Sequence, residues 1–202
     1  MGEGEVQKFG LVVISAPSGG GKSSLCAELL RRHGARLALS ISTTSRAPRG
    51  SEQNGVEYFF VERGEFESRI RAGGFAEWAD VHGNYYGTSR QTLEQFWSEG
   101  RHVLLDIDVQ GTASLRAAYP DRTFSVFIAP PDLEELERRL RGRGTDSEEA
   151  IQRRMKNARD EMGRMNEFHR VILNDQFDRA FAELEGLVLD FMDRLEAGKW
   201  YG

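Results

Sequence analysis

The stretch from Leu11 to Leu25, LVVISAPSGGGKSSL, constrains most strongly what this chain can fold into. It begins with an apolar run typical of a fully buried strand in a parallel sheet. Pro17 and the glycines from Gly19 to Gly21 then favour neither a strand nor a helix. Glycines allow backbone N–H groups to converge on an anion, and the helix that follows points its positive dipole end at the same place. The stretch therefore predicts a phosphate-binding loop.

The two residues that end the loop suit a nucleotide. We expect Lys22 to reach the outer phosphates as a cation and the Ser23 hydroxyl to be a ligand for Mg²⁺. The general pattern G-x-x-x-x-G-K-[ST] begins with glycine, whereas Ala16 stands at that position here. A methyl group is tolerable there if the residue keeps a negative φ. The alternative is a glycine-rich turn that binds no ligand.

Size and charge narrow the class of protein. A chain of 202 residues fits one large α/β domain, or a core with a small insert. A net charge of −5 argues against a general nucleic-acid or membrane-surface binder, which needs a basic field. No stretch approaches the roughly 20 apolar residues of a membrane helix, and the N-terminal segment has no signal-peptide pattern. We expect a cytoplasmic protein with neither nucleic-acid nor membrane partners, and the sequence leaves its oligomeric state open.

Residues 42–90 read as a small mixed insert after a helix predicted at 23–33 and a strand at 37–41. Arg46 and Arg49 flank Pro48, and two guanidinium groups held so close suit a second phosphate. The alternative is a solvated loop with two unrelated arginines. We expect a hairpin from Gly55 into Tyr58, and an alternating strand at 75–81 that turns at 82–84 and returns at 85–88. These strands carry polar groups that suit a pocket: Tyr58, Glu77, Tyr86 and Thr88. The tyrosines can also be packing residues with a solvated hydroxyl.

Two acids follow the apolar strand that begins at His102. Asp106 and Asp108 lie near the carboxyl end of this strand, where open α/β sheets bind ligands. Residues two apart on a strand share a face, so both carboxylates can act at one site if the strand continues through them. The alternative is that they cap a helix or are solvated.

The last third of the chain continues the α/β pattern. A buried strand is predicted at 123–129, a helix N-capped by Asp132 at 133–140, a strand at 171–173 and an amphipathic helix at 177–195. The segment 138–154 is rich in arginine, and Gly142 and Gly144 interrupt it. We interpret it as a mobile lid that closes over a polyphosphate. The alternative is a solvated helix with glutamate–arginine pairs.

Five segments together resemble the guanylate kinase family, in its bacterial form. In chain order they are APSGGGKSSL, S-x-S-T-T-S-R-x-P-R, GNYYGTS, LDIDVQG and RLRGRGTDSEE. The resemblance implies an α/β fold with a P-loop nucleoside monophosphate kinase core, whose parallel sheet is flanked by helices, a small mixed α+β GMP-binding insert and a helical lid. It divides one domain into core at 1–41, 91–138 and 167–202, insert at 42–90 and lid at 139–166. The implied reaction is ATP-dependent phosphorylation of GMP to GDP, with Mg²⁺ as cofactor.

The resemblance also assigns roles to single residues of this sequence. Those matched to the ATP site are Ser18, Gly19, Gly20, Gly21, Lys22, Ser23, Ser24 and Asn174, with Ser23 as the metal ligand. Those matched to the GMP site are Ser42, Arg46, Arg49, Tyr58, Glu77, Tyr86, Thr88, Asp106 and Asp108. Those matched to catalysis are Lys22, Arg46, Arg139, Arg143 and Arg154. Ser45 and Ser51 depart from the family pattern, and Ser51 affects the turn from Gly50 to Glu52.

The preference for guanine over adenine as the acceptor's nucleobase has a physical reason. Guanine presents N1–H and a 2-amino group on one edge, and a carboxylate such as Glu77 can accept from both, whereas adenine has no such pair. A buried carboxylate facing adenine is left unpaired, which discriminates by roughly 10⁴ or more. Two alternatives remain: a kinase for another nucleoside monophosphate, and a non-catalytic binding module of the same fold.

Overall fold

The computed structural model describes residues 8–81, 83–142 and 147–199. Within these ranges the core is a five-stranded parallel sheet in the order β2-β7-β1-β8-β9. In chain order its strands are β1 (Leu11–Ser15), β2 (Leu37–Leu39), β7 (His102–Asp106), β8 (Thr123–Ala129) and β9 (Arg170–Leu173). The predicted parallel sheet is confirmed.

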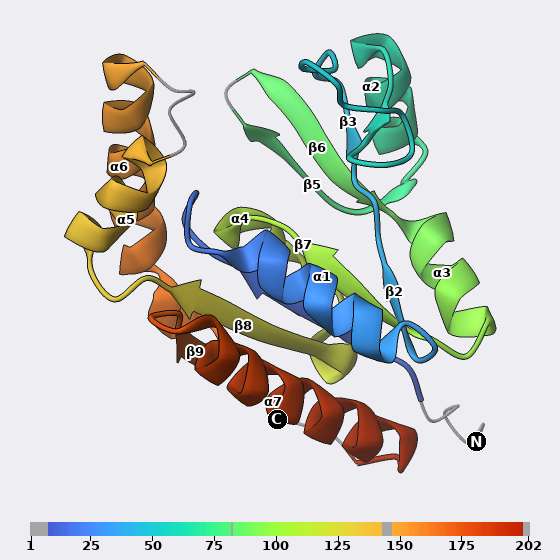
Figure 1. Ribbon diagram of the computed structural model, residues 1–202. Helices are drawn as coiled ribbons and strands as arrows, with labels where there is room; N and C mark the ends of the chain where they lie inside the picture. The colour runs from blue at the N-terminus through green and yellow to red at the C-terminus, as the bar shows by residue number, and fades with distance from the viewer. Residues whose placement is uncertain (1–7, 82, 143–146, 200–202) are drawn as a thin grey trace.

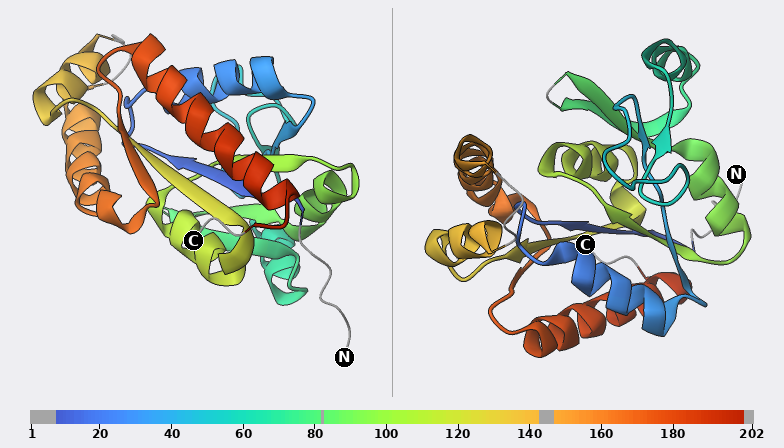
Figure 2. Two further views of the ribbon diagram at one scale, coloured as in Figure 1. Left: turned by 90° about the horizontal axis from the view of Figure 1, so that it is seen from below. Right: turned by 45° about the horizontal axis from the view of Figure 1, so that its top comes forward.

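Helices cover both faces of this sheet. The covering helices are α1 (Lys22–His33), α3 (Arg90–Ser98), α4 (Val109–Ala118) and α7 (Phe177–Glu196). The chain also forms α5 (Leu133–Arg141), α6 (Glu148–Gly163) and the short 3-10 turns η1 (Pro120–Arg122) and η2 (Met165–Glu167). Figure 2 shows α1 and α7 on one face and α4 on the other. Side chains of β1 alternate between the two resulting cores: Val12 and Ile14 pack with α1 and α7, and Leu11 and Val13 pack with α3 and α4. Burial on both faces explains the uninterrupted apolar run of this strand.

The polar segment after β2 forms a second, four-stranded sheet with the order β4-β3-β6-β5. Its elements are β3 (Thr43–Thr44), β4 (Phe59–Phe60), α2 (Arg63–Arg71), β5 (Phe75–Val81) and β6 (Asn84–Ser89). The β5–β6 pair is antiparallel, as the alternation predicts, but the hairpin expected from Gly55 into Tyr58 is wrong. β4 instead pairs in parallel with β3, since the intervening loop reverses the chain twice.

α5 and α6 share a small apolar core of their own, made by Leu136, Leu140, Ile151, Met155 and Ala158. In Figure 1 this pair stands on one side of the first turn of α1, and β5 and β6 stand on the other. None of the helices in the described ranges is long and apolar enough to cross a membrane.

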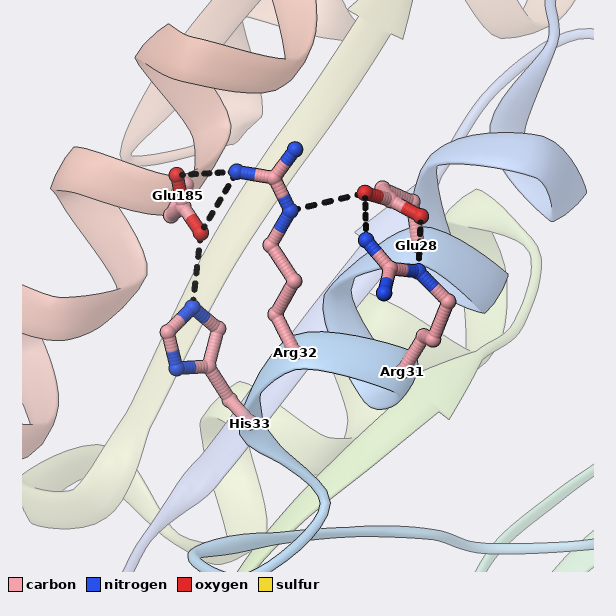
Figure 3. Close-up of polar contacts among 5 residues, drawn as sticks. All are labelled: Glu28, Arg31, Arg32, His33 and Glu185. Carbon is pink, nitrogen blue, oxygen red and sulfur yellow. Dashed lines mark hydrogen bonds and ion pairs between the residues drawn. The ribbon is translucent and has the colours of Figure 1, made fainter.

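The C-terminal end of α1 is fastened to α7 by charge (Figure 3). Glu185 on α7 accepts from Arg32 at 3.4 Å and lies 2.7 Å from His33 Nε2. Arg32 also donates to Glu28 at 2.7 Å, and Glu28 accepts a bidentate pair from Arg31. The network joins the helix that follows the phosphate loop to the last helix of the core.

Candidate active site

The loop between β1 and α1 has a conformation that requires glycine. Gly19 and Gly21 have φ of 93° and 89°, in the left-handed region where other residues are strained. The Gly20 N–H donates to the Pro17 carbonyl at 2.8 Å, which closes a tight turn. The loop residues 16–21 and the first residues of α1 line one cavity, where the backbone N–H groups of a glycine-rich loop and a helix N-terminus favour an anion.

Asn174 holds this loop from the far end of the chain. It follows β9 and is 7% exposed, and its side-chain amide donates to the Gly20 carbonyl at 2.7 Å. A Cβ on Gly21 would lie 2.2 Å from the same amide nitrogen, so the asparagine fits only against a glycine. Arg139 of α5 donates to the Asn174 carbonyl at 2.9 Å. The side chain of Asn174 therefore positions the phosphate loop.

Lys22 is paired with Asp106, the last residue of β7. Burial of the ammonium group opposes its charge, but the Asp106 carboxylate outweighs burial and raises the pKa of Lys22. Lys22 is therefore a cation, and a bound phosphate group can replace the Asp106 carboxylate as its partner. Ser15 ties the end of β1 to this region, because its hydroxyl donates to the Ile107 carbonyl at 2.6 Å.

Asp108 does not continue the strand, so the condition for a shared strand face is not met. β7 ends at Asp106, and Asp108 is the N-cap of α4, where its side chain accepts from the Gly111 N–H at 2.8 Å. The capping alternative is therefore correct for Asp108. Both carboxylates nevertheless line the same cavity.

Glu77 is a buried carboxyl group on β5, 7% exposed, and it accepts from the Thr88 hydroxyl at 2.6 Å. Strand pairing places Thr88 directly opposite Glu77. Burial raises the pKa of Glu77 to about 7, and the charge of Asp108 adds to this, against the hydrogen bonds from Thr88. Such a carboxyl group can change its ionisation when a ligand supplies donors.

Arg46 is the centre of a polar and aromatic cluster in the second sheet. It is 8% exposed and donates to Glu52 at 2.9 Å and to the Tyr86 hydroxyl at 3.1 Å. Its guanidinium lies 5.4 Å from the ring centre of Tyr58, and the rings of Tyr58 and Tyr86 meet edge to face at 5.7 Å. Arg49 is exposed, and its backbone N–H donates to Glu52. Glu52 thus holds the Gly50 turn and the buried arginine together.

The arginine-rich segment is only partly described. Arg139 donates to Glu135 at 2.7 Å besides its bond to the Asn174 carbonyl, and Arg154 lies on α6. Arg143 lies outside the described residues. The glutamate–arginine pairs of the alternative interpretation are present as well, since Arg141 donates to Glu148 at 2.6 Å.

One cavity of about 750 Å³ brings the two predicted groups of residues together. Predicted site residues that line it are Ser18, Gly19, Gly20, Gly21, Lys22, Ser23, Ser24, Ser42, Tyr58, Glu77, Tyr86, Asp106 and Asp108. Three more contact a lining residue directly: Arg46 bonds Tyr86, Thr88 bonds Glu77, and Asn174 bonds Gly20. The described residues Arg49, Arg139 and Arg154 lie outside the lining in this state.

Glu161 lines the cavity without having been predicted from the sequence. It lies on α6, and burial raises its pKa to about 7, with the positive charge of Lys22 acting in the opposite direction. No motif marks it, because its helix reaches the cavity only through the packing of α6 on α5.

The donor set suits a metal that arrives with a nucleotide. Among the described residues no group of three or more His, Cys, Asp or Glu side chains is placed to hold a metal ion. Mg²⁺ at phosphate sites takes most of its ligands from phosphates and water and one or two from the protein. The exposed Ser23 hydroxyl, with Asp106 at the end of the neighbouring strand, fits that requirement.

A parallel sheet with this phosphate loop, facing a second sheet across one cavity, defines a P-loop protein of the nucleoside monophosphate kinase type. The guanylate kinase family model matches residues 8–190. A guanylate kinase from Idiomarina loihiensis is 51% identical over 180 residues, covering 89% of this chain and 85% of its own. One from Synechococcus sp. (strain CC9902) is 48% identical over 175 residues, covering 87% and 92%.

Solved structures agree with these sequence matches. The crystal structure of guanylate kinase from Anaplasma phagocytophilum superposes with a TM-score of 0.76 at 28% identity, covering 97% of this chain and 92% of that one. The chain therefore belongs to the guanylate kinase family, and it is an enzyme of the nucleoside monophosphate kinase class.

Proposed function

We propose that this protein transfers the γ-phosphoryl group of ATP to GMP, giving ADP and GDP. The observation that carries the proposal is that a buried carboxyl group, Glu77, and the phosphate-loop cation, Lys22, face one cavity. The names of the relatives support the same reaction. In the transfer, the bond from the γ-phosphorus to the bridging oxygen of ATP breaks as a GMP phosphate oxygen bonds to that phosphorus.

Glu77 and Thr88 recognise guanine in this proposal. The ionised carboxylate accepts from N1–H and the 2-amino group, and the Thr88 hydroxyl keeps it in place through the 2.6 Å bond. Ser42, which also lines the cavity, lies near the base, and Asp106 and Asp108 complete the acceptor side. AMP is rejected because its base leaves a buried carboxylate without donors.

The acceptor phosphate is assigned to the second sheet. Arg46, Arg49, Tyr58 and Tyr86 bind it, and the buried guanidinium of Arg46 exchanges Glu52 for a phosphate oxygen. Arg49 is exposed on the same loop and joins when that loop closes on the ligand. The guanidinium of Arg46 lies over the rings of Tyr58 and Phe60 and donates to the Tyr86 hydroxyl, so it has little freedom and the phosphate meets a preorganised partner.

The donor is assigned to the loop after β1. Backbone N–H groups from Ser18 to Ser24 hold its phosphates, and Lys22 leaves Asp106 for the transferred group. The Ser23 hydroxyl would hold the Mg²⁺ that is bound with ATP, and that ion would supply charge neutralisation at the phosphates. The lid arginines Arg139, Arg143 and Arg154 add positive charge on closure.

No catalytic base is required. The attacking oxygen belongs to a phosphate that is already ionised near neutral pH, so positioning and charge neutralisation supply the rate. The core at 1–41, 91–138 and 167–202 then binds the donor, the insert at 42–90 binds the acceptor, and the lid at 139–166 closes over both. We place this activity in the cytoplasm, with the small molecules ATP and GMP as the protein's partners.

A panel of acceptors tests the proposal. A coupled assay of ADP release compares GMP, AMP, CMP, UMP and dTMP, with Glu77→Gln as the matched variant. We expect GMP to be preferred by roughly 10⁴ or more, and Glu77→Gln to lose most of this preference while the KM for ATP stays unchanged. Faster turnover with another acceptor refutes the assignment, and no turnover with any acceptor indicates a binding module.

A further inference from the structure

The carboxylate of Glu77 is packed against the first turn of α4. An ideal Cβ built on Gly111 would lie 2.9 Å from Glu77 Oε2 and 3.3 Å from its Cδ. The same Cβ would lie 3.2 Å from Cδ1 of Ile107. Contacts under 3.0 Å are essentially absent between real Cβ atoms and their neighbours, so a side chain at Gly111 and the present position of Glu77 exclude each other.

The backbone gives no reason for glycine at this position. Gly111 lies inside α4, and it is not among the glycines with positive φ. A glycine inside a helix costs roughly 0.5–1 kcal/mol relative to alanine. Glycine at this position is therefore explained by the space that the Glu77 carboxylate occupies beside it. Gly186, inside α7, is a matched contrast, because a Cβ there would meet nothing within 4 Å.

A Cβ at Gly111 would move Glu77 and leave α4 in place. The Gly111 N–H is held by the Asp108 side chain at 2.8 Å, and the Ser15 hydroxyl lies 2.9 Å from the Thr112 hydroxyl of the same turn. The backbone of Glu77 is fixed by the pairing of β5 with β6. The group that can give way is the end of the Glu77 side chain.

We propose that Gly111 is a positioning residue for guanine recognition: its missing Cβ makes the space in which the Glu77 carboxylate meets the base. The inference rests on the proposed function, because it assigns Gly111 a role through the residue that binds guanine. A carboxylate displaced by half an ångström or more loses good geometry toward Thr88 and toward both guanine donors together.

The test is Gly111→Ala with Gly186→Ala as its control, in the full chain, measured with ATP and GMP. We expect the KM for GMP to rise on the order of tenfold in Gly111→Ala, the loss of about one charge-assisted hydrogen bond. The KM for ATP and the kcat at saturating GMP stay within about twofold, because neither depends on the contact between Glu77 and the base. Gly186→Ala leaves both KM values unchanged.

A second variant separates positioning from general damage to α4. In a Glu77→Ala background, adding Gly111→Ala has almost no further effect on the KM for GMP, because the group it displaces is gone. An unchanged KM for GMP in Gly111→Ala overturns the inference, and so does an equal rise in the KM for ATP or a full additional loss in the double variant. If the wild-type chain prefers GMP in the acceptor panel, such a result refutes the role of Gly111 alone.

Discussion

Glu77 makes the affinity for GMP depend on pH. Its carboxyl group has a pKa of about 7 without ligand, while the proposed contact with guanine requires the ionised form. Below this pKa the group is protonated and can no longer accept from both N1–H and the 2-amino group. Affinity for GMP therefore falls as pH falls, and it levels off above pH ~8.

The size of the change in GMP affinity follows from the fraction of Glu77 that is ionised, because only that form binds guanine through both donors. With a pKa of about 7, the ionised fraction of Glu77 is roughly 0.9 at pH 8 and roughly 0.09 at pH 6. The apparent Kd is the intrinsic Kd divided by this fraction, so it rises about tenfold over the interval. At pH 7 binding releases about half a proton per GMP, because half of the carboxyl groups must ionise.

Calorimetric titration of the protein with GMP measures both quantities, in two buffers of different ionisation enthalpy. The phosphate of GMP also titrates near pH ~6, and Glu161 in the same cavity has a pKa of about 7. Glu77→Gln and Glu161→Gln separate these groups from Glu77. We expect the tenfold change to survive in Glu161→Gln and to shrink to the contributions of the phosphate and Glu161 in Glu77→Gln. An equal pH dependence in the wild type and in Glu77→Gln refutes the reasoning.

Three further substitutions test other parts of the structure. Lys22→Ala should lower kcat by about 10²–10³ with little change in the KM for GMP. Lys8→Ala, an exposed control, should change neither constant. Steady-state kinetics of both variants measures these constants. Asn174→Ala leaves the Gly20 carbonyl without its partner, so the KM for ATP should rise. The free energy of unfolding, measured in urea, should fall by about 1–3 kcal/mol. An unaltered KM for ATP contradicts the positioning role. Glu185→Gln weakens the partly exposed network between α1 and α7, so Tm should fall by no more than about 4 °C with kcat unchanged; a larger fall means that the network is worth more than surface pairs usually are.

Most of the core could be predicted because its signals are local. The apolar run of β1, the glycines that follow it and the alternation along β5 and β6 each fix an element within a short window. β8 agrees with its predicted bounds, Thr123–Ala129, because Pro130 ends the strand and Asp132 caps the next helix. The pairing of β4 depends on the long loop that precedes it. No local pattern indicates whether such a loop reverses the chain once, giving an antiparallel pair, or twice, giving a parallel one.

The helix α4 was not predicted, and Gly111 is part of the reason. A glycine three residues after the N-cap weakens the helical pattern, and the preceding aspartates fit a continued strand equally well. The reason for this glycine lies in Glu77, which is 34 positions away in the sequence and meets it only in the folded chain. A contact of this kind has no local signature.

The candidate site divides in the same way. Lys22 and the loop glycines are marked by their own neighbours in the sequence, and Arg46 by the turn that holds it. Glu161 reaches the cavity through packing of α6, and the use of the Asn174 side chain depends on where β9 ends relative to Gly20. The sequence supplied the residue types, but the tertiary contacts decide what each side chain does.

The bond between Asn174 and Gly20 also has a consequence for the order of synthesis. The loop is made early, but the amide that holds it is 154 residues further along the chain. A growing chain therefore carries the glycine-rich segment, and the α1 sequence after it, for most of translation without the group that fixes their geometry. We expect nascent chains released before Asn174 to bind ATP poorly, because the Gly20 carbonyl has not yet met its partner.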